Sequence, residues 1–244
     1  MTSILNQHPD VILRGQIFKD DPDYQRQLQE EVGMLPFTGQ LFDDEIESRQ
    51  RFDRLQDDPA GREPRNAAAV AESFYRGQAL RTTARQVGIK FHGGTLYDDE
   101  VRDIFLGQQP YDFIVLHREN LLAAGISWYQ ARTLNQWVKR PGDSDARPPL
   151  TVDIGALTGF VERTHQDVAD WRRMLAEYGK PYLELTYEQI TGPDFDYALV
   201  WDHLGVRHIP TPPPKSLKII KSYDHITNLA EVRAAFAGRG FGQL

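Results

Sequence analysis

Arg118 and Ser127 have the residue types and positions that suit an anion-binding site. Arg118 stands just beyond the apolar run 113–116, and Ser127 comes nine residues later, within apolar spacing typical of a helix. The run 113–116 predicts a strand that is buried on both faces. Ligands of open α/β sheets bind at the carboxyl ends of strands, and exposed N–H groups of a following helix attract anions. The pattern therefore predicts a phosphate site at Arg118.

The spacing of these two residues limits how they can share a ligand. Nine residues of continuous helix span ~13 Å, so one phosphate contacts both side chains only if the helix begins late or the phosphate lies between them. Taken alone, the local pattern is more typical of an arginine in a salt bridge and of a serine without a role in binding. The residues by themselves leave both interpretations open.

The same stretch has a wider resemblance. The apolar strand, Arg118, Ser127 and the pair Gln136-Trp137 resemble the 3′-phosphate-binding segment of sulfotransferases that use 3′-phosphoadenosine 5′-phosphosulfate (PAPS). The nine-residue spacing is similar to that of the bacterial carbohydrate and lipid sulfotransferases. The resemblance implies that PAPS is the donor and that Arg118 and Ser127 hold its 3′-phosphate.

A second segment is similar to the same family. The predicted strand 182–186 is followed by Tyr187 and Glu188, and a Leu-Gly-Val triplet occurs at 204–206. The resemblance implies that Tyr187 contacts the adenine region of the donor and that Glu188 supports the local fold.

The first residues resemble a third part of the family. The stretch SILNQHPDVILRGQIF at 3–18 is similar to the segment that follows the loop for the 5′-phosphosulfate group. That Gly/Ser/Thr-rich loop and the strand before it would immediately precede Met1. We expect this loop and strand to be encoded upstream of Met1, which would then be a wrongly chosen start. The alternative is a protein that genuinely lacks both.

Three residues are candidates for a catalytic role at the acceptor hydroxyl. Gln16 stands where much of the family has a glutamate, and an amide orients a hydroxyl but cannot take its proton. His8, before a proline, and His92, at the end of a predicted strand, have the required chemistry. A structural histidine held by hydrogen bonds is the alternative for both.

The resemblance implies a sulfotransferase that passes a sulfuryl group from PAPS to a hydroxyl of a glycan, a lipid or a small molecule. The first alternative is a non-catalytic protein that binds adenosine 3′,5′-bisphosphate or PAPS. The second is a scaffold without a ligand, whose acidic helices between residues 20 and 58 would bind a partner. Another nucleotide-handling P-loop relative, such as a kinase, is a further alternative, and the absence of a GxxxxGK[ST] motif argues against it.

The elements that would position these residues predict an α/β fold. Apolar runs predict strands at 11–13, 87–91, 113–116 and 182–186. Helical spacing predicts helices at 24–32, 67–76, 97–106, 119–137 and 194–204, one that begins at Asp153 or Gly155 and ends at 178, and one near 228–232. We expect one domain over 1–244 with three layers, a parallel β-sheet flanked by helices. The resemblance implies the P-loop-NTPase-like sulfotransferase fold.

Composition narrows the function classes. A formal net charge of −7 argues against a general nucleic-acid binder, and no 18-residue apolar run could cross a membrane. The chain has no cysteine, which excludes disulfides and thiolate zinc sites, and no His/Asp/Glu set has metal-ligand spacing. We expect a cytoplasmic protein that needs no metal. The sequence does not predict an oligomeric state.

Overall fold

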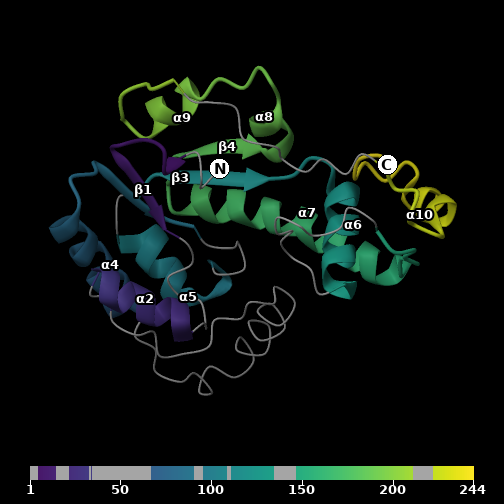
Figure 1. Cartoon of the computed structure of the whole chain (residues 1–244), viewed down its shortest axis with the longest axis horizontal. Helices are drawn as coiled ribbons and strands as arrows, with labels where there is room; N and C mark the ends of the chain where they lie inside the picture. Colours follow the sequence, from purple (N-terminus) through teal and green to yellow (C-terminus); the bar gives the residue numbers. More distant parts are fainter. Residues whose placement is uncertain are drawn as a thin grey trace. The chain divides into compact units, whose positions relative to one another are not determined.

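The computed structural model describes residues 5–14, 22–32, 34, 67–90, 96–108, 111–134, 147–210 and 222–244 (Figure 1). Its strands are β1 (Val11–Arg14), β2 (Gln86–Ile89), β3 (Phe113–His117) and β4 (Tyr182–Thr186). Its helices are α2 (Pro22–Val32), α4 (Ala67–Arg81), α5 (Asp99–Arg102), the π-helical turn η3 (Asp103–Gln108), α6 (Leu121–Thr133), α7 (Ile154–Glu177), α8 (Tyr187–Thr191), α9 (Ala198–His203) and α10 (Leu229–Phe236). The chain is therefore mixed α/β.

The four predicted strands are all present, and they pair in two short sheets. β1 and β2 run parallel, with Val11 opposite Gln86 and Arg14 opposite Ile89. β3 pairs with β4, and their arrows point the same way in Figure 1. Within the described residues the strands thus form two two-stranded sheets in place of one larger sheet, because no described strand joins the two pairs.

The chain divides into two compact units. Unit 1 comprises residues 1–113, 173–183 and 196–212, and unit 2 comprises 114–172, 184–195 and 213–244. β3, β4 and α7 each contain residues of both units. The assignment of one domain to 1–244 stays a prediction.

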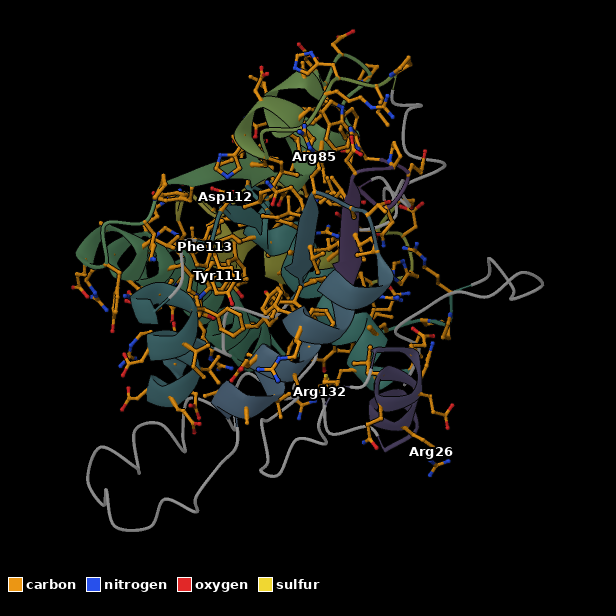
Figure 2. All side chains as sticks on the ribbon, turned by 90° about the vertical axis from the view of Figure 1, so that its left-hand side faces the viewer. Arg26, Arg85, Tyr111, Asp112, Phe113 and Arg132 are labelled. Atoms are coloured by element: carbon orange, nitrogen blue, oxygen red, sulfur yellow. The ribbon has the colours of Figure 1, made fainter. Side chains whose placement is uncertain are left out.

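Unit 1 has a core built by α2, α4, α5 and η3. Phe74 of α4 and Val101 of α5 are fully buried in it, and Tyr111 and Phe113 pack against it (Figure 2). Arg26 of α2 is exposed. The predicted helix at 97–106 occurs as α5 followed by η3, with Asp98 accepting a hydrogen bond from Val101 N at 3.2 Å as the N-cap.

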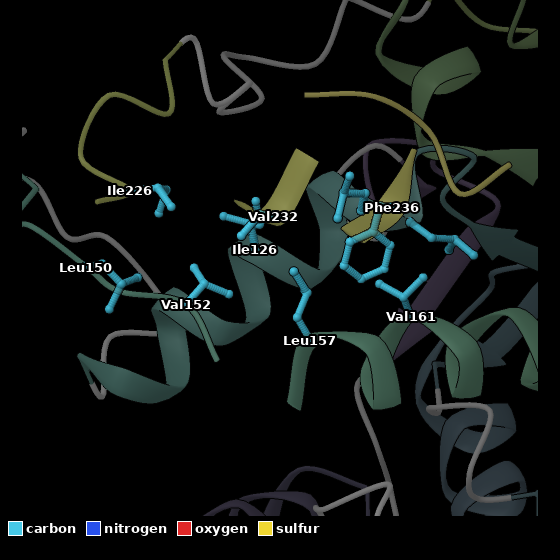
Figure 3. Close-up of a cluster of buried hydrophobic side chains, with 10 residues drawn as sticks. Ile126, Leu150, Val152, Leu157, Val161, Ile226, Val232 and Phe236 are labelled. Carbon is cyan, nitrogen blue, oxygen red and sulfur yellow. The ribbon is translucent and has the colours of Figure 1, made fainter. Parts of the chain in front are cut away.

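Unit 2 has a separate core, in which α6, α7 and α10 meet (Figure 3). Its buried residues, called the unit 2 cluster below, are Leu121, Leu122, Ile126, Leu150, Val152, Leu157, Val161, Ile226, Val232 and Phe236. α6 approaches α7 closely because Gly125 has no side chain there: a Cβ at this position would lie 2.6 Å from Leu157 Cδ1. This core fixes the helix that follows β3.

The helix ends follow local signals. α7 is followed by Gly179 at a φ of 61°, in agreement with the predicted stop at this glycine. α8 was not predicted; it begins in a capping box in which Thr186 and Gln189 bond each other's backbone N–H groups. The predicted helix at 194–204 is confined to Ala198–His203.

Candidate anion-binding site

Arg118 lies directly after β3, and its side chain packs on Tyr187, the first residue after β4. The guanidinium carbon is 4.0 Å from the centroid of the Tyr187 ring, within cation–π distance. Arg118 is half-buried, and no carboxylate within the described residues forms an ion pair with it. The alternative in which Arg118 forms a salt bridge is therefore not observed within the described part of the chain. Two of the predicted donor-binding residues are in contact although they are far apart in the sequence.

Glu188 fixes the turn that carries Arg118. Its carboxylate accepts hydrogen bonds from the backbone N–H groups of Glu119, at 3.0 Å, and Asn120, at 3.3 Å. Such charge-assisted bonds are stronger than neutral ones. Glu188 thus supports the local fold between β3 and α6.

The first N–H groups of α6 all have acceptors within the chain. The Asn120 side chain caps the helix by accepting from Ala123 N at 2.9 Å, and Leu122 N donates to Phe241 O at 2.9 Å. Leu121 N donates to Glu119 O. The prediction that exposed N–H groups of this helix attract the anion is wrong, because the Asn120 side chain and backbone carbonyls already accept from them.

Ser127 lies six residues into α6, ~9 Å along the axis from Leu121. Its side chain is half-buried, and its hydroxyl has no hydrogen-bond partner among the described residues. α6 begins at Leu121, three residues after Arg118, so that a phosphate shared by Arg118 and Ser127 stays a prediction.

Two arginines, Arg118 and Arg147, affect the ionisation of Tyr223. Tyr223 packs against the unit 2 cluster, and burial raises the pKa of its hydroxyl while the charges of Arg118 and Arg147 oppose that rise. Arg147 also adds to burial in lowering the pKa of His225, against the opposite effect of Asp224.

A partly exposed ion-pair network precedes Arg118. His117 Nε2 lies 2.7 Å from Glu184 Oε1, and Arg172 Nε donates to Glu184 Oε2 at 3.0 Å. Arg172, and then His117, holds the pKa of the Glu184 carboxyl below its usual range, against the effect of burial. The network ties β3 and β4 to α7 at the end where Arg118 and Tyr187 lie.

Of the three candidate catalytic residues, the structure describes His8. His8 is 2% exposed; its Nδ1 accepts from Asp10 N at 3.0 Å, and its Nε2 lies 2.8 Å from Arg207 O. Because Nδ1 accepts a hydrogen bond, Nε2 is the protonated nitrogen, and its N–H donates a hydrogen bond to Arg207 O. Neither nitrogen is therefore free to act as a base. This geometry favours the structural interpretation of His8. Gln16 and His92 lie outside the described residues.

Sequence reasoning missed Arg147, Tyr223 and the His117–Glu184 pair. The signal for the pair was available, since a histidine at the end of one strand and a glutamate within the next both interrupt apolar patterns. Arg147 stands in a polar, proline-rich stretch, and Tyr223 follows another polar stretch. Neither stretch has a period from which a site could be inferred.

No family model matches this chain, and no curated protein or solved structure has significant similarity to it. Within the described ranges, no group of three or more His, Asp or Glu residues is placed to hold a metal ion. No helix in the described part of the chain is both long and apolar enough to span a membrane.

Proposed function

We propose that this chain binds a 3′-phosphorylated adenine nucleotide at Arg118, and that it is a PAPS-dependent sulfotransferase with the P-loop-NTPase-like, three-layer fold of that family. The observation that carries the proposal is the Arg118–Tyr187 contact. It joins the arginine expected to hold the 3′-phosphate to the tyrosine expected at the adenine, at 4.0 Å. A cation beside a flat aromatic ring suits a ligand that has both a phosphate and a base.

The residues present fit the 3′ end of the donor. Arg118 supplies a planar fork of N–H donors that can bind two phosphate oxygens at once. Ser127 offers a hydroxyl with no partner in the described part of the chain. One face of the Tyr187 ring is covered by Arg118, so an adenine would stack on the other face or meet the ring edge-on.

In sulfuryl transfer, PAPS supplies the activated sulfuryl group, and the protein orients it toward an acceptor hydroxyl. Arg118, Ser127 and Tyr187 would hold the donor through its 3′-phosphate and base, which fixes the position of the rest of the nucleotide. Gln16 would orient the acceptor hydroxyl, and His92 is the remaining candidate for taking its proton. The acceptor class, glycan, lipid or small-molecule alcohol, stays open.

The test is ligand-induced stabilisation by adenosine 3′,5′-bisphosphate. At ~100 times its dissociation constant, a ligand that binds only the folded chain stabilises it by ~2.7 kcal/mol, which a thermal shift detects. We expect this shift in the natural chain and its loss in the double variant Arg118→Ala, Ser127→Ala. Arg132→Ala is the matched control, because Arg132 is an exposed arginine in the last turn of α6.

Two results would count against nucleotide binding at this site. One is the absence of a shift in the natural chain up to millimolar bisphosphate. The other is a shift that survives in the double variant. Adenosine 5′-monophosphate, which lacks the 3′-phosphate, should give a much smaller shift than the bisphosphate.

An assay of sulfuryl transfer distinguishes an enzyme from a non-catalytic binding protein. The glutamine at position 16 favours the non-catalytic protein. The chain is incubated with PAPS and a pool of glycan, lipid and phenol acceptors, and adenosine 3′,5′-bisphosphate is measured by chromatography. Release that depends on acceptor supports the enzyme. Tight binding of PAPS without release supports a protein that holds the nucleotide without turnover.

A further inference from the structure

His117, the last residue of β3, has an oxygen acceptor at each of its two ring nitrogens. Its Nε2 lies 2.7 Å from Glu184 Oε1, and its Nδ1 lies 3.4 Å from Arg118 O, which is longer than a typical hydrogen bond. The His117 side chain is 12% exposed, so water has little access to the ring. Both contacts lie within unit 2. The ring therefore joins the backbone of Arg118 to the side chain of Glu184.

Neither acceptor can donate a proton to the ring. A backbone carbonyl has none, and the Glu184 carboxyl is ionised at neutral pH because Arg172, and then His117, keeps its pKa below the usual range. A neutral imidazole has one N–H group, so it donates to one of the two oxygens and turns a lone pair toward the other. The protonated ring has two N–H groups and can donate to both. The geometry therefore suits a protonated His117.

The charged groups around His117 come from two other elements. Glu184 of β4 faces the ring directly, and Arg172 of α7 donates to the same carboxylate through Nε at 3.0 Å. When His117 is neutral, the charges of Arg172 and Glu184 cancel. When His117 is protonated, two positive charges face one negative charge, and one positive charge is in excess. Protonation therefore adds a positive charge at the strand end that carries Arg118.

We infer that His117 is a positioning residue whose protonation strengthens anion binding at Arg118. The inference rests on the proposed nucleotide binding, and it names the proton as a regulator of that site. The His117 ring contacts Glu184 whereas Arg118 packs on Tyr187, so His117 acts through the Arg118 backbone.

Two effects of the protonated ring predict the direction of the pH dependence. The ring holds the Arg118 carbonyl by a hydrogen bond, which fixes the residue that is proposed to bind the phosphate. It also adds a positive charge to the same strand end, which favours an anion. Binding should therefore tighten as the pH falls through the range in which histidines ordinarily gain a proton, about pH 8 to 5.

The experiment measures the dissociation constant of adenosine 3′,5′-bisphosphate by calorimetry at about pH 5.5 and about pH 8.5. The natural chain is compared with His117→Gln, Glu184→Gln and the control His208→Gln. His208 is a matched control because its Nε2 also lies 2.7 Å from a carboxylate oxygen, Asp202 Oδ1, but both side chains are exposed and belong to unit 1. Circular dichroism at both pH values, without ligand, establishes that each variant is folded.

The phosphates of the ligand also change charge at about pH 6, which weakens its binding to every chain in acid. This effect cancels in the ratio of the dissociation constant of a variant to that of the natural chain at the same pH. For His117→Gln we expect a ratio of about 2 to 10 at the lower pH, the loss of one hydrogen bond, and a ratio close to unity at the higher pH. Glu184→Gln should show the same trend, because it removes the charge that pairs with the protonated ring. His208→Gln should give a ratio close to unity at both pH values.

Two outcomes would overturn the inference, and they are distinguishable. If the natural chain binds the bisphosphate and Arg118→Ala abolishes binding, but folded His117→Gln has the same ratio at both pH values, the proposed function stands and this extension is wrong. Should His117→Gln not fold, the ratios of Glu184→Gln decide in the same way. If the natural chain does not bind the bisphosphate at either pH, the proposed function fails and the extension fails with it.

Discussion

Replacing Gly242 by alanine should loosen the contact between the C-terminal segment and the turn that carries Arg118. Gly242 has a φ of 98°, which an alanine adopts only with strain. A Cβ there would lie 2.3 Å from Asn120 Oδ1 and 2.9 Å from Asn120 Cα. The second contact is with backbone, so rotation of the Asn120 side chain cannot relieve the clash. The segment must move away from the start of α6.

The cost of that movement follows from the bonds that the segment makes. A non-glycine residue in a disfavoured φ region costs about 1–3 kcal/mol. Displacement also breaks the bond from Leu122 N to Phe241 O, at 2.9 Å, and that from Asn120 Nδ2 to Gln243 O, at 2.7 Å. At about 0.5–1.5 kcal/mol for each bond, these add about 1–3 kcal/mol to the strain.

Gly240→Ala is the matched control. Gly240 has a φ of 75°, and a Cβ there meets nothing within 4 Å, so this variant measures backbone strain without the clash. Urea unfolding should show that Gly242→Ala costs about 1–3 kcal/mol more than Gly240→Ala. Hydrogen exchange at the Leu122 amide should accelerate in Gly242→Ala alone. Equal costs for the two variants, with the Leu122 amide still protected, would refute the docking of this segment on α6.

Two further predictions concern the frame of the site. Gly125→Ala should destabilise the chain by about 1–3 kcal/mol in thermal unfolding, since its Cβ would lie 2.6 Å from Leu157 Cδ1 in a full core. Gly159→Ala should stabilise the chain by up to about 1 kcal/mol, because the nearest atom to its Cβ would be 4.0 Å away in the Arg163 side chain. If Gly125→Ala and Gly159→Ala stabilised the chain equally, the packing of α6 on α7 would be contradicted. Glu184 has a pKa lowered from the usual 4.5, chiefly by Arg172, so its stabilising contribution is present above pH 4.5 and is lost as the pH falls through the folded-state pKa. Glu184→Gln should therefore be less stable than the natural chain at about pH 6. In acid unfolding, this difference in stability should shrink toward about pH 3. A difference that does not depend on pH would show that this carboxylate is not paired.

The strands could be predicted because their signals are local. Each of the four is a short apolar or alternating run bounded by polar or turn residues, and all four occur within a residue or two of the predicted bounds. The end of α7 was predictable for the same reason, since Gly179 has the positive φ that few other residues adopt. The pairing of the strands into two short sheets depends on contacts between distant segments, which local patterns do not encode.

The site was predictable only in part. The position of Arg118 at a strand end follows from the apolar run before it, but its contact with Tyr187 depends on the pairing of β3 with β4. The acceptors for the first N–H groups of α6 include Phe241, which no nearby sequence signal connects to this helix. The bridge between Leu150 and Ile226 is again a long-range contact.

The first N–H groups of α6 already donate hydrogen bonds within the chain. We therefore expect different residues to determine the stability of the chain and its affinity for an anion. Because Glu188, Asn120 and Phe241 accept the hydrogen bonds of the turn and the helix start, those groups hold the backbone in place. In the proposed site, anion binding would depend on charged side chains, whose removal leaves no buried hydrogen bond unpaired within the described residues. Variants such as Gly242→Ala should therefore lower stability first, whereas Arg118→Gln should lower affinity with little change in stability. If both classes of variant changed stability and affinity together, the arginines would be part of the frame, and the anion would bind elsewhere.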